Sequence, residues 1–315
     1  MKAYRYENIC LVPQYSDLFS RGDADTSFVL GNNQFLLPVI PANMKAVIDH
    51  DIARELSKEG YMYVMHRFGV DVTKFVDTAN RESWPVVSIS VGVKRPDMEL
   101  IRQLSSSGSK VDYITIDIAH GYCEAMKRMI ELVKEKLSDT YVIAGNVATP
   151  EAVYYLNEWG ADCVKIGIGQ GSPCTTKDKT GFTMPMFTCT KTCTENTDVP
   201  VIADGGIRCN GDISKALAAG ATAVMAGGLF ASCTDSPANS INIDGAVFKA
   251  YYGSASFENK GHNNHIEGIL KKIPSSDMSY MQKLREVEQD LQSSISYAGG
   301  KNACDLRGTP YMVIS

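Results

Sequence analysis

Residues 141–177 of the chain run YVIAGNVATPEAVYYLNEWGADCVKIGIGQGSPCTTK. Two nearly continuous apolar runs, Tyr141–Val147 and Cys163–Gly169, flank a segment with helical character. We expect this helix to span Pro150–Trp159, because Thr149 is a suitable N-cap and proline suits the first helical position. Short apolar runs without alternation are typical of strands that are buried on both faces. The stretch therefore predicts a strand–helix–strand unit with a parallel sheet.

The same unit recurs on both sides of this stretch. Six further apolar runs are expected to be strands: Leu37–Met44, Tyr61–Arg67, Val86–Gly92, Tyr113–Ala119, Val199–Gly205 and Ala223–Leu229. Helical patterns lie between several of them, at Ala46–Lys58, Glu124–Lys136 and Asp212–Ala219. Eight such units favour an α/β fold of the TIM (β/α)8-barrel type in a single domain over residues 1–315, with an open doubly wound sheet as the alternative.

The composition is that of an ordinary globular protein. The chain has 315 residues, of which 44% are hydrophobic and 21% charged, and a net charge of −5. Without a block of Lys and Arg, nucleic acid is not expected as a partner. Without a long apolar run or a targeting pattern at the N-terminus, we expect no membrane partner and a cytoplasmic location. The nine scattered cysteines are then expected to be reduced thiols.

The carboxyl ends of the last two predicted strands carry glycine pairs. They end in Asp204-Gly205-Gly206 and Gly227-Gly228. The loops after these two strands commonly hold a phosphate in barrel enzymes, and glycine leaves the backbone N–H groups open to an anion. A single pair would equally well only turn the chain, but two pairs at equivalent positions predict a phosphate site, with Asp204 as an acceptor for a ribose.

The loop after the sixth predicted strand, about residues 169–185, holds the candidate nucleophile. Cys174 follows a glycine-rich run and has hydroxyl residues, Lys177 and Lys179 as neighbours. This setting at the catalytic face of a barrel favours a reactive thiol. The alternative is a structural cysteine in the core, which is the interpretation we give to Cys163 within its strand.

A long segment follows the last predicted strand. A polar stretch with Gly and His covers residues 257–268, and a helix is expected from about Ser279 to Ser296. A long polar insertion near a catalytic face is typical of a mobile lid. We interpret residues from about 253 to 281 as a flap, although a loop without a role would give the same pattern.

Several motifs resemble the IMP dehydrogenase and GMP reductase family. They are LPVIPANM, ITIDIAHG, VIAGNVATPE, KIGIGQGSPCTTK, PVIADGGI, VMAGGLF, YYGSAS and SSISYAGG, and they cover almost the whole chain in the order of the family. The dehydrogenases usually carry a regulatory insertion after the second strand, for which this chain has no room. Their flap also carries an Arg-Tyr pair, which residues 257–281 lack. The resemblance is therefore to the reductase branch, in its compact bacterial form.

This resemblance implies an NADPH-dependent reductive deamination of GMP to IMP and ammonia, through a covalent thioimidate on Cys174. Thr176 resembles the proton-relay hydroxyl of the family, and we choose Glu286 as its carboxylate partner, with Glu288 as the neighbouring option. The alternatives are an IMP dehydrogenase that lacks the regulatory insertion, a purine-nucleotide-binding barrel without catalysis, and a reductase of a modified purine nucleotide.

The resemblance also implies binding residues. The GMP phosphate is expected against Ser172, Gly205, Gly206, Gly227 and Gly228, its ribose at Asp204, and its base against Gly253, Ser254 and Ala255. The cofactor NADPH is expected at Asp117, Ile118 and Ala119, with Ser20 and Arg21 contributed by a neighbouring subunit of a homotetramer. A monovalent cation such as K+ is expected at the carbonyl groups of Gly169, Gly171 and Cys174, where Gln170 and Pro173 depart from the family pattern.

Overall fold

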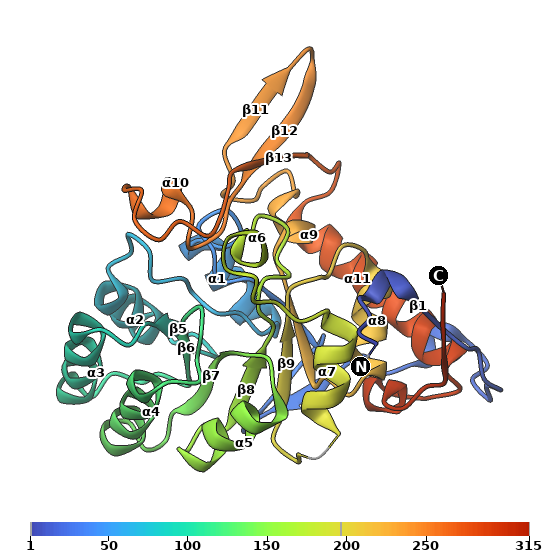
Figure 1. Cartoon of the computed structure of the whole chain (residues 1–315), viewed down its shortest axis with the longest axis horizontal. Helices are drawn as coiled ribbons and strands as arrows, with labels where there is room; N and C mark the ends of the chain where they lie inside the picture. The colour runs from blue at the N-terminus through green and yellow to red at the C-terminus, as the bar shows by residue number, and fades with distance from the viewer. Residues whose placement is uncertain (1, 196, 315) are drawn as a thin grey trace.

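The computed structural model describes residues 2–195 and 197–314. Its centre is a curled parallel sheet with the strand order β4-β10-β9-β8-β7-β6-β5, surrounded by helices (Figure 1). The strands are β4 (Val39–Pro41), β5 (Ser88–Val91), β6 (Tyr113–Asp117), β7 (Tyr141–Val147), β8 (Cys163–Ile166), β9 (Val201–Asp204) and β10 (Ala223–Ala226). The predicted α/β fold of the TIM-barrel type is thus confirmed.

The second predicted strand, Tyr61–Arg67, is reduced to a single bridge. Met65 pairs in parallel with Ile89 of β5, and the segment has no further strand pairing in the described chain. The Tyr63 hydroxyl donates to the carbonyl of Val86 (2.9 Å) and accepts from the N–H of Ser88 (3.2 Å). The Tyr63 side chain thus occupies the backbone groups of Val86 and Ser88 that a neighbouring strand would use. The strand pairing with β5 is therefore short at this position.

Helices alternate with the strands on the outside of the barrel. They are α1 (His50–Glu59), α2 (Val72–Arg81), α3 (Arg95–Ser107), α4 (Glu124–Lys136), α5 (Pro150–Glu158), α7 (Met186–Thr194) and α8 (Asn210–Ala218). The Thr149 side chain accepts from the N–H of Ala152 (3.3 Å), as expected of the N-cap of α5. The helix predicted from Ala46 begins later, at His50, because Asp49 caps it by accepting from the N–H of Ile52 (3.0 Å).

Short elements close the amino-terminal end of the barrel and join the two chain ends. The hairpin of β2 (Phe28–Leu30) and β3 (Asn33–Phe35) packs against Tyr113, whose hydroxyl donates to the carbonyl of Leu30 (2.7 Å). Strand β1 (Ile9–Leu11) pairs with β14 (Tyr311–Val313). Three 3-10 helices pack against α8 and α11 (Tyr280–Tyr297): η1 (Tyr6–Asn8), η2 (Arg21–Asp23) and η3 (Ala303–Leu306).

The segment after β10 builds an antiparallel sheet that projects from the barrel (Figure 1). It consists of β11 (Ser240–Ile243), β12 (Ala246–Tyr251) and β13 (Lys271–Pro274). The remaining helices are α6 (Thr176–Thr180), α9 (Gly228–Ala231), α10 (Phe257–Lys260) and α11 (Tyr280–Tyr297). The projecting sheet was not predicted, since its strands are short and partly exposed and lack a continuous apolar run. Among the helices described, none has the length and apolar character needed to cross a membrane.

Candidate active site

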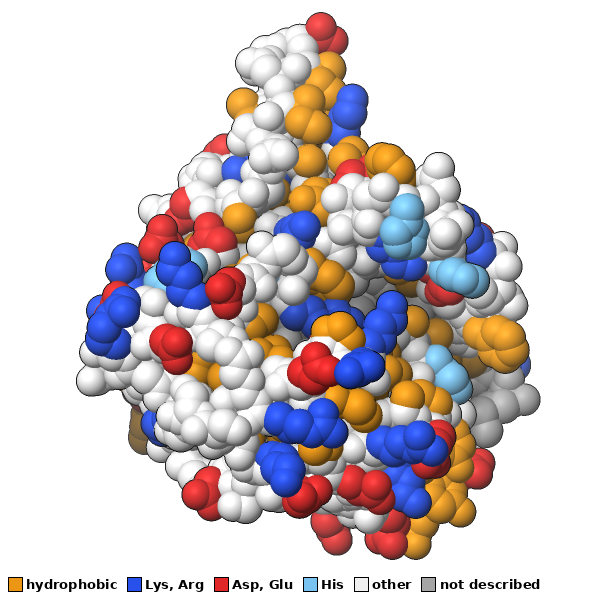
Figure 2. Space-filling model, turned by 90° about the vertical axis from the view of Figure 1, so that its left-hand side faces the viewer, with side chains coloured by type: hydrophobic (Ala, Val, Ile, Leu, Met, Phe, Trp, Pro, Cys, Tyr) orange, Lys and Arg blue, Asp and Glu red, His pale blue; other side chains and the backbone are white. Residues whose placement is uncertain are grey.

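A cavity of about 1030 Å³ opens at the carboxyl ends of the parallel strands. Residues that follow β4, β6, β7, β8, β9 and β10 line it, together with the loop before α6 and the segment between β12 and β13. In the space-filling view, Lys and Arg side chains border a hollow below the projecting sheet (Figure 2). Pockets for small ligands usually measure roughly 300–1,000 Å³, so this cavity has room for a nucleotide and a second ligand.

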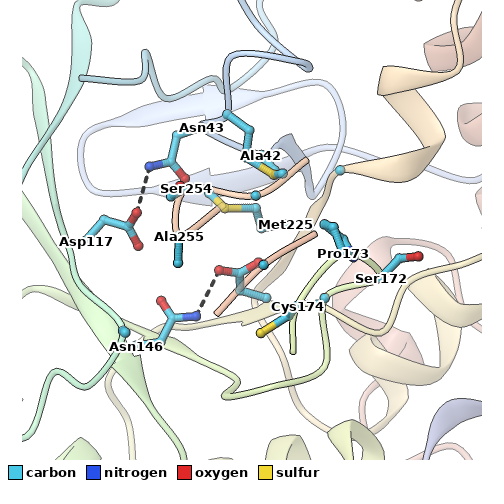
Figure 3. Close-up of a pocket in the computed structure, with 18 of the residues that line it drawn as sticks. Ala42, Asn43, Asp117, Asn146, Ser172, Pro173, Cys174, Met225, Ser254 and Ala255 are labelled. Carbon is cyan, nitrogen blue, oxygen red and sulfur yellow. Dashed lines mark hydrogen bonds between the residues drawn. The ribbon is translucent and has the colours of Figure 1, made fainter. Parts of the chain in front are cut away.

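Cys174 points into this cavity from the loop between β8 and α6 (Figure 3). Its N–H donates to the carbonyl of Gly171 (3.0 Å), which fixes the turn. Its thiol donates to the Thr176 hydroxyl (Sγ to Oγ1, 3.2 Å). The Thr176 hydroxyl in turn donates to the carboxylate of Glu267 (Oγ1 to Oε2, 2.6 Å). These three groups form a continuous path for a proton from the sulfur to a carboxylate.

The expected contact between Thr176 and Glu286 is wrong. Glu286 lies on α11, where it pairs with Lys283 and accepts from the Asn210 side chain (3.2 Å). The hydrogen bond from Lys283 holds the pKa of Glu286 below its usual range. The helix thus directs this carboxylate away from the loop, and Glu267 takes the position beside Thr176. The usable clue was that the polar stretch 257–268 contains only two carboxylates, Glu258 and Glu267.

Main-chain hydrogen bonds join the flap to the nucleophile loop. The N–H of Thr175 donates to the carbonyl of Glu267 (2.9 Å), and the N–H of Ile269 donates to the carbonyl of Pro173 (2.9 Å). Within the flap, the N–H of Glu267 donates to the carbonyl of Ala255 (3.0 Å). The flap therefore pairs like an added strand beside Cys174, and this pairing sets the position of Glu267.

A buried ion cluster forms the opposite side of the cavity. The Lys165 ammonium group of β8 donates to Asp117 (Oδ1, 2.9 Å), to Asp204 (Oδ2, 2.6 Å) and to the Asn146 side chain. Burial alone would lower the pKa of Lys165, but the two carboxylates outweigh it and hold that pKa above its ordinary value. Asn43 donates to Asp117 (3.1 Å), as a dashed line in Figure 3 shows. Asn146 donates to Asp204 (2.9 Å).

Lys165 and Asn146 were not predicted as site residues. The sequence does indicate Lys165, because it is a charged residue inside an apolar run that is expected to be buried on both faces. A buried charge needs a partner of opposite charge nearby.

The glycine pairs expand the cavity beside this cluster. Gly205 (φ 98°) and Gly206 (φ 79°) adopt left-handed backbone conformations that favour glycine. A β-carbon at Gly227 would meet the Tyr251 hydroxyl at 2.1 Å, so that position also requires glycine. Tyr251 lines the cavity and is a further residue that the sequence did not predict. On the neighbouring wall, the Lys271 ammonium group contacts the Ser172 hydroxyl (3.3 Å), which adds a positive charge where a phosphate was expected.

Most of the predicted binding residues meet in this cavity. Those that line it are Asp117, Ile118, Ala119, Gly169, Gly171, Ser172, Cys174, Thr176, Asp204, Gly205, Gly206, Gly227, Gly228, Gly253, Ser254 and Ala255. Ser20 and Arg21 lie elsewhere in the chain: Ser20 accepts from the N–H of Gly22 (3.2 Å), and Arg21 donates to Ser293 on α11 (3.4 Å). Their expected contribution from a neighbouring subunit stays a prediction.

Comparison with known proteins gives one consistent result. A family model described as IMP dehydrogenase / GMP reductase domain matches residues 3–313. A GMP reductase from Variovorax paradoxus (strain S110) is 48% identical, over 100% of this chain and 97% of its own length. A GMP reductase from Acidovorax sp. (strain JS42) is 46% identical over the same shares. One from Mesoplasma florum is 44% identical, over 100% of this chain and 98% of its own.

Proposed function

The chain belongs to the IMP dehydrogenase / GMP reductase family, and we propose that it acts as a GMP reductase, which converts GMP to IMP and ammonia with NADPH as the reductant. The observation that carries this proposal is the hydrogen-bonded series of Cys174, Thr176 and Glu267 at the cavity wall. It combines a nucleophile with a proton path, as the displacement of an amino group requires.

The proposed position of GMP follows from the shape and charge of the cavity. Its phosphate would lie against Ser172 and the backbone at Gly206, Gly227 and Gly228, where glycine leaves N–H groups open and Lys271 adds a positive charge. Its ribose would donate to Asp204. Its base would face Gly253, Ser254 and Ala255 of the flap, which places C2 near Cys174.

The proposed reaction starts with the bond between the Cys174 sulfur and C2 of the purine. The thiol proton moves through the Thr176 hydroxyl towards Glu267 as this bond forms. The same path returns a proton to the departing nitrogen, so that the C2–N bond breaks and ammonia leaves. The sulfur then holds the purine as a thioimidate, which is a better hydride acceptor than the amino-bearing carbon. After reduction at C2, the carbon–sulfur bond breaks, Cys174 recovers its electron pair, and IMP is released.

The residues on the other side of the cavity fit a nicotinamide cofactor. NADPH bound there would supply the hydride that replaces the nitrogen at C2. Asp117, Ile118 and Ala119 line this side, and Asp117 is kept as an anionic acceptor suited to a ribose hydroxyl. Burial alone would raise the pKa of Asp117, but the Lys165 ammonium outweighs it and lowers that pKa. Ser20 and Arg21 of a neighbouring subunit would complete the cofactor site.

A monovalent cation and a tetramer complete the proposal. K+ would be held by the carbonyl groups of Gly169, Gly171 and Cys174. The Gly171 carbonyl already accepts the N–H of Cys174 (3.0 Å), and its second lone pair is available to a cation. We also propose that the protein acts in the cytoplasm as a homotetramer.

The test is to mix purified protein with GMP and NADPH and to follow NADPH absorbance and ammonia together. We expect equal amounts of NADPH consumed and ammonia formed, and loss of both in a Cys174→Ser variant. NAD reduction with IMP, without a reaction of GMP, would replace the proposal with an IMP dehydrogenase. No reaction in either assay would refute GMP as the substrate. The remaining interpretations would be a purine-nucleotide-binding barrel without catalysis and a reductase of a modified purine.

A further inference from the structure

The ammonium group of Lys165 bridges the two halves of the cavity. Its side chain is 1% exposed, and β8 places it between the strands that carry Asp117 and Asp204. It lies 2.9 Å from Asp117 Oδ1 on the side proposed for the cofactor. It lies 2.6 Å from Asp204 Oδ2 on the side proposed for the ribose of GMP. One buried cation thus contacts the carboxylates that face both ligands.

The two carboxylates depend on this cation for their arrangement. Without it, two like charges would share a partly buried space, where repulsion is much stronger than in water. Asp204 directs Oδ2 at both Lys165 and Asn146, and Oδ1 has no protein partner among the described residues. Since Oδ2 is held from two directions, the remaining oxygen is fixed as an acceptor for a ligand hydroxyl.

We propose that Lys165 is a positioning residue that holds Asp204 towards the nucleotide and Asp117 towards the cofactor. Lys165 touches neither reacting atom, and its action is exerted through the two carboxylates. The inference rests on the proposed function for the identity of the two ligands. A merely structural lysine would affect folding, whereas a positioning lysine sets the affinity for both ligands at once.

The first test replaces Lys165 by methionine, which has a similar length and no charge. GMP binding is measured by calorimetry without cofactor, and the KM for GMP and for NADPH is measured in turnover. We expect the Kd for GMP and both KM values to rise about tenfold or more, and kcat to change less. A Lys165→Met protein that binds GMP within twofold of the parent would overturn the proposal.

A matched control comes from the other buried lysine. Lys249 is 2% exposed and donates to the carbonyl of Thr234 (2.9 Å), and it does not line the cavity. A Lys249→Met variant should lower the melting temperature and leave the Kd for GMP unchanged. If it weakened GMP binding as much as Lys165→Met does, the effect would belong to any buried lysine, and the proposal would fail.

A double variant separates positioning from folding. Lys165, Asp117 and Asp204 together carry a net charge of −1, and Lys165→Met combined with Asp117→Asn keeps that value. The repulsion on Asp204 is then gone, while its hydrogen bond from Asn146 remains. We expect the Kd for GMP to recover to within about threefold of the parent and the KM for NADPH to stay raised. The proposal would be overturned if the Kd for GMP did not recover, or if the KM for NADPH recovered as well.

The double variant also decides the matter if Lys165→Met alone does not fold. Because calorimetry with GMP requires no turnover, the experiment remains informative if the reductase assignment fails. A parent protein that binds GMP and forms no IMP would refute the reaction, and the Lys165 series would still test the role at Asp204.

Discussion

Two sides of the cavity are built in different ways. We call the ion cluster of Asp117, Asn146, Lys165 and Asp204 the floor, and the series of Cys174, Thr176 and Glu267 the roof. The floor consists of side chains on neighbouring strands, bonded to one another around a buried ammonium group. The roof joins two loops, and its hydroxyl–carboxylate contact spans 91 positions in the sequence.

This difference indicates that the floor serves ligand binding and the roof serves the chemical step. Strands fix the floor to the barrel core, so its groups suit binding, which requires constant geometry. Loops carry the roof, and its contacts depend on how the flap pairs with the nucleophile loop, which suits a group that must act during turnover. We therefore expect damage to the roof to lower kcat and damage to the floor to raise KM. The predictions below test that division, starting with the largest effect.

After the loss of activity expected for Cys174→Ser, the largest effect should come from Glu267→Gln. The amide keeps the size of the side chain but cannot accept the proton that Thr176 passes on. General acid–base groups contribute about 10²- to 10⁴-fold to rate, so kcat should fall by that order while the KM for GMP stays within about threefold. Steady-state kinetics with an ammonia assay would measure both values.

Glu286→Gln is the matched control for this variant. Glu286 pairs with Lys283 on α11 and lies away from Thr176, so its loss should change kcat less than about threefold. If Glu286→Gln were the more damaging of the two, the roof as described would be wrong.

The sequence predicted two of the four floor residues, Asp117 and Asp204, and two of the three roof residues, Cys174 and Thr176. Asp117 and Asp204 follow apolar runs, and the geometry of a parallel barrel brings the carboxyl ends of such runs together. Cys174 was found by the same rule and by the resemblance to a family, and Thr176 by the resemblance alone. Glu267 was missed because its position depends on the pairing of two loops, which leaves no periodic pattern in the sequence. Lys165 was overlooked inside a run that otherwise fits a buried strand.

The next effect should come from the floor. In an Asp204→Asn variant, the amide oxygen must face the donors Lys165 and Asn146. The NH2 group then replaces the charged oxygen that would accept from the ribose. A hydrogen bond to a charged group is worth roughly 1.5–3 kcal/mol, so the KM for GMP should rise about tenfold to a hundredfold. The effect on kcat should be smaller than in Glu267→Gln. An equal loss of kcat in the two variants would remove the distinction between floor and roof.

A smaller effect should come from the lysine that anchors the flap. The Lys179 ammonium group of α6 donates to the carbonyl of Ile266 (2.6 Å), next to Glu267. Lys179→Met would remove one bond, while the N–H of Thr175 still donates to the carbonyl of Glu267 (2.9 Å). We expect kcat to fall about threefold to tenfold, because a single exposed contact contributes roughly 1 kcal/mol.

The control for Lys179 is Lys177→Met, which changes the same short helix and for which the structure shows no comparable contact with Ile266. Lys177→Met should retain kcat within about twofold. If both variants kept full activity, the flap would be positioned by its main-chain pairing alone.

The smallest effect on turnover is expected from His66, which acts on stability. His66 lies beside the floor, next to Arg67, which donates to the carbonyl of Asp117 (2.9 Å). Burial, with a smaller contribution from Lys45, lowers the pKa of His66 from 6.5 to about 4. The unfolded chain therefore binds a proton at a higher pH than the folded chain does. Acidification from pH 6.5 towards 4 should destabilise the fold, by about 2 kcal/mol at pH 5 from this group alone.

A His66→Gln variant makes this contribution measurable. The substitution removes the titrating group and costs stability at pH 7, because the Nδ1 atom that accepts from the N–H of Phe68 (3.2 Å) is replaced. Urea unfolding at pH 7 and pH 5 should show a free energy of unfolding that falls less steeply in the variant than in the parent, since the carboxylates titrate alike in both. An equal fall would mean that His66 is protonated without cost, and that the region beside the floor is open to water. In that case the rigidity assigned to the floor would rest on Lys165 and its carboxylates alone, which the binding measurements with GMP test separately.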